Sequence, residues 1–460
     1  MTAASETGIE TGVDPLSQDG KSISAALACQ IHYNTVPRFP SSMSPIMRRA
    51  SKRSSQKLSA DSQRLVTFAQ GLVLSGSRME GRAWEHELDT SLQKQLKNNH
   101  QEIIDYALDH LYKSDLGAYD ALMESLEAVS ESCVIEHDGT TFDALLIAIP
   151  ILAWTRFSIA SGAISSDMVL TLSAHLYGHV LAENTKTMMA PMLFAIDQLP
   201  RTHAETFAFT RNLANAAISG TQPRWPANFP ETAPFLSDTR YLLAAVAVPA
   251  GAPVFRWQAT LNPAERDIVL EQWKAQATPN IARLLPGCGI ELLLPEAYYV
   301  ACREADNRIR PVSIQAAVHY LTHALGVLPS ELRAIIGDFG EESADDRVDE
   351  YRIGFLLKQI PEVVYGVVWP LYGQEELEIS LRDLSAGSEN PEEESKYKTP
   401  LEEIIGLLKE AGVTGVMHRK EHFPMEFCED CGAPLYSDPD GELVHAEMPE
   451  DVPQETGHFH

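Results

Sequence analysis

The sequence predicts an α plus α+β architecture: an all-helical N-terminal domain, an α+β domain with ferredoxin-like βαββαβ order, and a small zinc-knuckle tail. Three observations support this prediction. Apolar residues recur at helical spacing in the first half, strand-length apolar runs follow in the second half, and a Cys-x-x-Cys pair stands near the end. The expected units are a disordered arm over residues 1–58, a helical domain over 59–220, a linker over 221–236, an α+β domain over 237–425 and an acidic zinc-knuckle tail over 426–460.

The composition is that of a globular protein with a large acidic excess. Of 460 residues, 44% are hydrophobic, which is enough to bury a core, and the length corresponds to about three structural units. The net charge of −28 repels phosphate backbones, so general nucleic-acid binding is not expected. The sequence has no secretion signal and no apolar run of the roughly 18 residues that span a bilayer. We therefore expect a cytoplasmic protein without a membrane partner.

The helical domain is predicted from amphipathic spacing. Leu65, Phe68 and Leu72 fall on one helix face, and Ser59 stands where an N-cap is needed. Comparable stripes follow, and they indicate four successive helices in a bundle or hairpin array. The four apolar stripes lie within residues 65–73, 84–96, 103–111 and 116–126, and further helices are expected over 142–154, 167–182, 190–198 and 204–218.

The α+β domain is predicted from a change of period after residue 237. Tyr241–Val248 is a continuous apolar run of strand length, and a helix with proline in its first turn follows over 263–285. Two short strands, a helix and a third strand complete a ferredoxin-like order. These elements are expected over 290–294, 298–302, 313–325 and 332–339, with further strands over 351–358, 363–371 and 413–417 and a helix over 400–411.

The zinc-knuckle tail carries the most specific chemistry of the sequence. Cys428 and Cys431 are separated by two residues, so both sulfurs can bind one ion, and Gly432 permits the tight turn between them. Asp438-Pro-Asp-Gly is a turn signal, and a hairpin there folds His445 back toward the cysteines as a third ligand. The cofactor expected is a structural zinc ion, because no helix with Glu-x-x-His supplies an open catalytic position.

The fourth ligand stays open at this stage. His458 is the first choice, and His460, His422, His418 or a water molecule are alternatives. From residue 421 to the end there are eleven Asp or Glu and no Lys or Arg, which argues against a nucleic-acid-binding finger. The competing interpretations are an accidental thiol pair in a tail, and a redox pair, which the neighbouring acidic residues disfavour.

Two histidine pairs at i, i+4 are weaker metal candidates, His175 with His179 and His319 with His323, since neither has the adjacent glutamate of a metalloprotease helix. A small-molecule enzyme with a site between the two large domains is an alternative function. Its candidate residues are His137, His175, His179, His203 and Arg156.

The leading functional hypothesis is a non-catalytic interaction or regulatory protein with an unidentified protein partner. It rests on the helical array and on the absence of a nucleotide-binding or hydrolase motif. A second alternative is an RNA-associated factor that uses the basic arm from Arg48 to Lys57. Met43 or Met47 is a possible natural start in place of Met1.

Several longer stretches carry a family resemblance. They include Val134-Ile-Glu-His-Asp-Gly, Ile196-Asp-Gln-Leu-Pro-Arg and Val363-Val-Tyr-Gly-Val-Val-Trp-Pro, and the closing Phe427-Cys-x-x-Cys-Gly-Ala-Pro-Leu-Tyr. Over about residues 47–460 the chain resembles a bacterial family called domain of unknown function 2863. The resemblance implies a bacterial cytoplasmic protein and transfers no catalytic residue.

Overall fold

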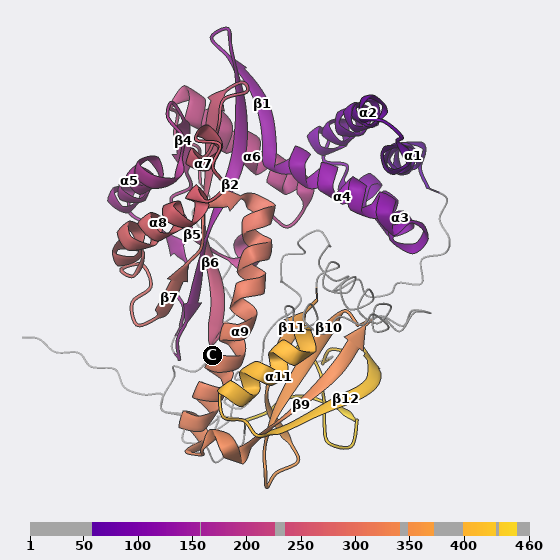
Figure 1. Ribbon diagram of the computed structural model, residues 1–460, viewed down its shortest axis with the longest axis vertical. Helices are drawn as coiled ribbons and strands as arrows, with labels where there is room; N and C mark the ends of the chain where they lie inside the picture. The colour runs from indigo at the N-terminus through magenta and orange to yellow at the C-terminus, as the bar shows by residue number, and fades with distance from the viewer. Residues whose placement is uncertain are drawn as a thin grey trace, which may run out of the picture.

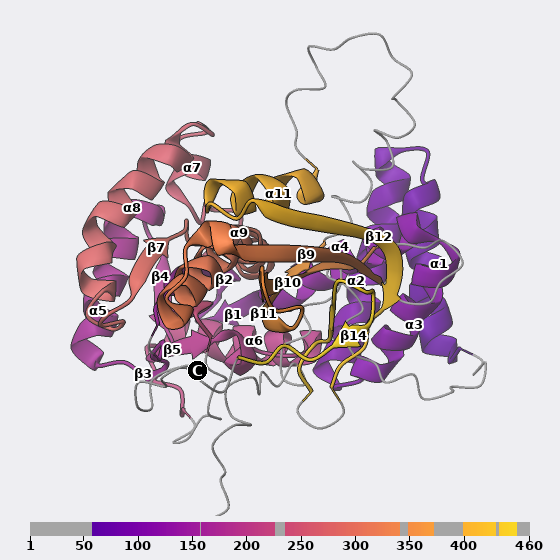
Figure 2. The same ribbon diagram turned by 90° about the horizontal axis from the view of Figure 1, so that it is seen from below.

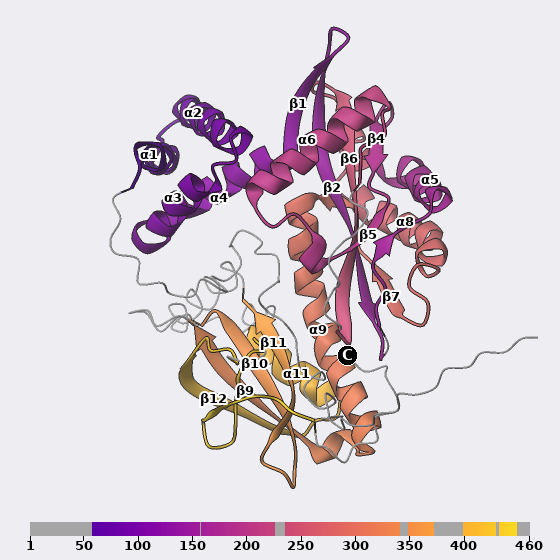
Figure 3. The same cartoon turned by 180° about the vertical axis from the view of Figure 1, so that it is seen from behind.

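The computed structural model describes residues 58–156, 158–225, 235–340, 348–371, 399–428 and 432–448. Residues 1–57 of the expected arm, with the basic stretch from Arg48 to Lys57, lie outside these ranges. The described residues form a helical unit, a large sheet and a smaller sheet, which Figures 1 and 3 show from opposite sides. The helices are α1 (Ala60–Leu74), α2 (Arg78–Lys97), α3 (Gln101–Ser114), α4 (Leu116–Glu131), α5 (Ser166–His175), η2 (Leu176–Val180), η3 (Ile196–Gln198), α6 (His203–Ser219), α7 (Arg256–Ala259), α8 (Glu265–Ile281), α9 (Tyr298–Leu325), η4 (Pro329–Glu331) and α11 (Pro400–Glu410).

The first four helices form as the amphipathic stripes predict. The Ser59 hydroxyl accepts a hydrogen bond from the Ser62 amide at the start of α1. Leu65, Leu88 and Leu122 are fully buried where the helices meet. Because each helix buries one stripe, the unit is held together by the hydrophobic effect.

The large sheet is antiparallel throughout its described strands. Its main path runs β1–β2–β6–β5–β3, while β4 also pairs with β6, and β7 and β8 also pair with β2. The strands are β1 (Ser132–His137), β2 (Thr140–Trp154), β3 (Gly162–Ala163), β4 (Lys186–Met189), β5 (Met192–Ala195), β6 (Ser237–Pro249), β7 (Gly289–Leu292) and β8 (Glu296–Ala297).

This sheet corrects the prediction of an all-helical N-terminal half. Residues 142–154, expected to be a helix, lie in strand β2 and pair with β6 from Phe142↔Pro249 to Trp154↔Ser237. A strand buried on both faces is a continuous apolar run, and periodicity alone does not separate such a run from a buried helix. The expected linker at 221–236 therefore joins two parts of one sheet.

Helices cover both faces of the large sheet. On one face, α6 and the first half of α9 pack against alternate residues of β2 and β6. On the other face, α5, η2 and α8 pack against the intervening residues. Figure 2 shows α5 and α8 on the side of the molecule away from α9.

Helix α9 corrects the ferredoxin-like order. The expected strand at 298–302 is the first turn of this 28-residue helix. Tyr298, Cys302 and Ala305 are buried at helical spacing, so burial against the sheet overrides the strand preference of the tyrosines. The second half of α9 packs on the small sheet instead, through Ile314 and Leu321.

The strands of the small sheet lie close to the strand segments predicted from the sequence, but they form a sheet separate from β6 and β7, which the prediction placed in the same domain. Strands β9, β10 and β11 are antiparallel neighbours, and β12 lies parallel to β9 on the other side, in the order β11–β10–β9–β12. Helices α9 and α11 cover one face. The strands are β9 (Leu332–Gly340), β10 (Glu350–Leu357), β11 (Val363–Pro370) and β12 (Gly415–Pro424), and the separate pair β13 (Tyr436–Ser437) and β14 (Leu443–Val444) follows.

Candidate metal centre and candidate binding pocket

The backbone around Cys428 forms a tight turn. The Cys428 amide donates to the Ala433 carbonyl, and the Gly432 amide donates to the Cys428 carbonyl, both at 2.8 Å. Gly432 has a φ of +73°, in the left-handed region that favours glycine. Phe427 and Pro434 form an antiparallel bridge at the base of the turn. Cys431 lies outside the described residues, so the structure describes one of the two predicted thiol ligands.

The hairpin predicted from Asp-Pro-Asp-Gly is confirmed. The Asp438 carboxylate accepts from the amides of Asp440 and Glu442 at 2.9 Å, and Tyr436 pairs with Val444 across the hairpin. His445 follows β14 directly. Phe427, next to Cys428, pairs with Pro434, and Val444, next to His445, pairs with Tyr436, so both predicted ligands lie on segments that pair with residues 433–437.

The other candidate ligands are placed less favourably or lie outside the description. His418 Nε2 is 2.8 Å from Asp338 Oδ1. Both ring nitrogens of His422 are buried and have no hydrogen-bond partner among the residues that the structure describes. His458 and His460 are not among the described residues. Within the described ranges, which omit Cys431 as well, no three His, Cys, Asp or Glu side chains are grouped to hold a metal ion.

Arg352 on β10 binds the segment around Cys428 to the small sheet. Its side chain is fully buried, and Nη1 donates to the carbonyls of Glu426 and Leu435, both at 2.7 Å. Nε lies 2.6 Å from Glu350 Oε1. The guanidinium also lies 4.4 Å from the ring centroid of Phe339. One side chain therefore binds both Glu426 and Leu435 to the sheet.

A notch in the sheet receives Tyr436. Gly354 and Gly366 are opposite each other on β10 and β11, and a Cβ at Gly366 would lie 2.0–2.4 Å from three atoms of the Tyr436 ring. Tyr436 packs there with Ile335 and Val363. Because side chains alternate along a strand, this cluster occupies the face opposite α9 and α11. The hairpin segment with Tyr436, Val444 and Ala446 thus covers part of the face of the small sheet opposite α9 and α11.

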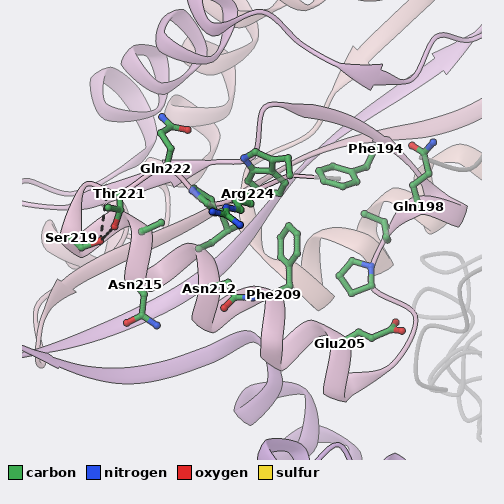
Figure 4. Close-up of a pocket in the computed structure, with 16 residues that line it drawn as sticks. Phe194, Gln198, Glu205, Phe209, Asn212, Asn215, Ser219, Thr221, Gln222 and Arg224 are labelled. Atoms are coloured by element: carbon green, nitrogen blue, oxygen red, sulfur yellow. Dashed lines mark hydrogen bonds between the residues drawn. The ribbon is translucent and has the colours of Figure 1, made fainter. Parts of the chain in front are cut away.

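A separate pocket of about 620 Å³ lies between α6 and residues 221–225. In Figure 4, Phe209 stands in its centre, with Phe194 and Gln198 toward one end and Ser219 and Thr221 toward the other. The Phe209 ring meets those of Phe194 and Trp225 edge-on, at centroid distances of 6.2 and 6.1 Å. The wall is therefore aromatic.

The rim of this pocket is polar without net charge. It presents the amides of Gln198, Asn212, Asn215 and Gln222. The one carboxylate, Glu205, accepts from the Thr202 amide in the capping box of α6. The described residues that line the pocket include no histidine, cysteine or lysine. Its chemistry suits binding better than acid–base or nucleophilic catalysis.

The histidines of the enzyme hypothesis are not brought together. His137 is at the turn between β1 and β2, 3.4 Å from Asp138. His175 and His179 stack at 6.4 Å on the α5 face of the large sheet, and burial together with His179 lowers the pKa of His175. His203 is buried at the start of α6 on the opposite face, where burial lowers its pKa to about 3.

The remaining candidates also stand apart. Arg156 is exposed just beyond the end of β2. The ring centroids of His319 and His323 on α9 are 4.2 Å apart. His323 Nδ1 is 2.8 Å from the His319 carbonyl oxygen, so this nitrogen is hydrogen-bonded to the helix backbone. The sequence prediction missed Arg352 and the pocket. The sequence does contain a pattern that points to Arg352. Glu350 and Arg352 are charged residues two positions apart in an otherwise apolar strand, so their side chains lie on the same face of the strand.

The comparisons with known proteins agree with the resemblance drawn from the sequence. A family model described as protein of unknown function (DUF2863) matches residues 50–459. No curated protein and no solved structure matches the chain. Among the described helices, none is both long and apolar enough to cross a membrane. Because the family model spans most of the chain, this protein belongs to the family of proteins of unknown function DUF2863.

Proposed function

We propose that this protein is a non-catalytic interaction or regulatory protein of the bacterial cytoplasm, in which a structural zinc ion holds the C-terminal segment on the small sheet. The observation that supports this most is the contact of Arg352 with the carbonyls of Glu426 and Leu435 on both strands of the knuckle. Because Arg352 holds the segment with the turn at Cys428 on the sheet, a metal bound there would stabilise the structure of that segment.

Zinc would be held by Cys428, Cys431 and His445, with His458 as the fourth ligand. Such a closed tetrahedral set of thiolate and imidazole ligands is typical of structural sites. The knuckle is too short to bury a core of its own, so metal binding would supply part of its folding free energy. In this proposal the metal stabilises the segment that covers the sheet and takes no part in a reaction.

The non-catalytic role is favoured by the placement of the candidate residues. The histidines proposed for catalysis lie on opposite faces of the large sheet, and the described pocket is lined by aromatic and amide side chains. The net charge of −28 favours a protein or neutral partner over a nucleic acid.

Metal analysis of the purified full-length chain tests the zinc site. We expect about one zinc per chain, retained after dialysis against a weak chelator and lost in Cys428→Ser and Cys431→Ser. Cys288→Ser is the matched control, because Cys288 lies in the large-sheet half of the chain and should leave the zinc content unchanged. A metal-free wild type that is fully folded would overturn the zinc site.

The interaction role needs its own test. Affinity purification from native lysate should return a stoichiometric protein partner with the wild-type chain. Recovery of no such partner would count against the interaction role while leaving the zinc measurement unaffected.

A further inference from the structure

We propose that the groove between α6 and residues 221–225 binds an extended, proline-rich peptide in the polyproline II conformation. This inference extends the interaction role by naming a chemical class of partner. It does not depend on zinc, because the residues lining the groove come from β5, η3, α6 and residues 199–200 and 221–225, and none comes from the knuckle.

The shape of the groove favours a linear ligand. One wall follows α6 from Glu205 to Ser219, and the chain then turns at Gly220, whose φ is +72°, so that residues 221–225 return along the helix as the second wall. Fourteen steps of an α-helix correspond to about 21 Å. A polyproline II segment of about seven residues has the same length.

The aromatic side chains favour proline in that ligand. Phe209 stands edge-on to both Phe194 and Trp225, with interplanar angles of 83° and 62°. Rings set at such angles leave ridges and slots, and grooves lined in this way bind the flat pyrrolidine rings of proline-rich segments. Phe209 and Trp225 are half-buried, so part of each ring stays accessible.

The polar groups favour a ligand with unpaired carbonyls. A polyproline II backbone makes no internal hydrogen bonds, so its carbonyls need donors when they leave water. Asn212 and Gln222 supply amide donors around the groove. Trp225 Nε1 is a buried donor with no acceptor among the described residues. With one Glu and one Arg in the lining, the groove also suits a neutral ligand.

The experiment measures binding of a fluorescein-labelled ten-residue peptide with repeated Pro-x-x-Pro to the full-length chain by fluorescence polarisation. A peptide with alanine in place of each proline is the ligand control. We expect saturable binding of the proline peptide, and binding at least tenfold weaker for the alanine peptide. Saturable binding of both peptides with equal affinity would overturn the specificity for polyproline II, and binding of neither up to millimolar concentration would overturn the proposal altogether.

Three variants separate the groove from the rest of the molecule. Trp225→Phe keeps a ring beside Phe209 but removes the N–H, and Asn212→Ala removes an exposed amide. Each should weaken binding about fivefold, the effect of one neutral hydrogen bond. Tyr177→Ala removes an exposed aromatic ring on η2, at the opposite face of the large sheet, and should leave binding unchanged.

Further outcomes assign the ligand and keep this proposal distinct from the zinc site. Cys428→Ser should bind the peptide as the wild type does, even if it loses zinc. Equal binding by Trp225→Phe, Asn212→Ala and the wild type would overturn the assignment to this groove. Saturable binding of a neutral oligosaccharide such as maltoheptaose in place of the peptide would overturn the ligand class.

Discussion

Arg352 illustrates what one buried charge does in this fold. Removing a guanidinium from water costs several kcal/mol, and its ion pair with Glu350 and two backbone carbonyls offset that cost. The pair adds little net stability compared with apolar residues of the same size. Its larger effect is on position, because the planar donor group fits the carbonyls of Glu426 and Leu435 in one arrangement.

Substitution of Arg352 tests this arrangement. Arg352→Met leaves the Glu350 carboxylate buried without its partner, so the free energy of unfolding should fall by roughly 3–5 kcal/mol in urea denaturation. The double variant with Glu350→Gln should recover part of the loss. Arg283→Met, at an exposed position, should change stability by no more than about 0.5 kcal/mol. A loss below about 1 kcal/mol for Arg352→Met would contradict the role of the pair.

The glycine notch makes a second prediction at the level of single residues. Gly366→Ala places a Cβ within 2.4 Å of the Tyr436 ring, so the ring must move and stability should fall by about 1–3 kcal/mol. Cleavage in limited proteolysis should then begin within residues 426–448. Gly178→Ala meets no atom within 4 Å and serves as the control. Unchanged proteolysis of Gly366→Ala would show that Tyr436 does not hold the segment.

At the scale of elements, the N-terminus of α9 is bound to the end of α4. The Tyr299 amide donates to Glu131 Oε2 at 2.9 Å, and Arg303 Nη1 lies 2.7 Å from both carboxylate oxygens of Glu127. Burial raises the pKa of Glu131 to about 7, even though the amide hydrogen bond lowers it. The helical unit is therefore joined to α9 through a carboxyl group that titrates near neutrality.

This junction makes stability depend on pH. The folded pKa of Glu131 lies above the ordinary value of 4.5, so the folded state binds the proton more tightly, and this contribution is complete below pH 4.5 and lost as the pH rises through 7. Glu131→Gln keeps an acceptor for Tyr299 but removes the titration. The variant should therefore gain about 2 kcal/mol relative to the wild type between pH 5 and pH 8 in denaturant melts. A constant difference across that range would contradict the assignment.

The sequence predicted well the helices that bury one face and expose the other. Helices α1 to α4 and α11 show an apolar stripe, and Ser59 caps α1 as expected. The predictions for strand β2 and for the start of α9 were wrong, because partners distant in sequence bury both segments. Strand β2 lies between β1 and β6, and Tyr298 packs into the core of the large sheet, whose strands come from distant segments. Local periodicity contains no information about those partners.

The candidate site was predictable to a similar extent. The turn at Gly432 and the hairpin at Asp438 follow from local residue preferences, so the sequence indicated both. Arg352 and the notch at Gly366 depend on which sheet face the tail covers, and nothing near Cys428 encodes that choice. The aromatic pocket was missed because Phe194, Phe209 and Trp225 come from three separate segments of the chain.

At the scale of the whole molecule, the large sheet joins segments that are far apart in sequence. A fragment of residues 58–225 contains β2 but not β6, so its longest apolar strand would have an open edge. We expect that fragment to aggregate, and a fragment of residues 58–310 to remain monomeric in size-exclusion chromatography, since it completes the sheet. A soluble monomer of the shorter fragment would contradict this account.

Because one helix serves two cores, the phase of α9 fixes how the two sheets face each other. Its first half packs on the large sheet through Cys302 and its second half on the small sheet through Ile314, with Pro311 between them. Each residue of an α-helix turns the chain by about 100°. A single-residue insertion beside Pro311 would therefore rotate one layer out of reach of its partner, whereas seven added residues would nearly restore the phase. Length variation among relatives should be rare at this point and, where it occurs, should come in steps of two turns.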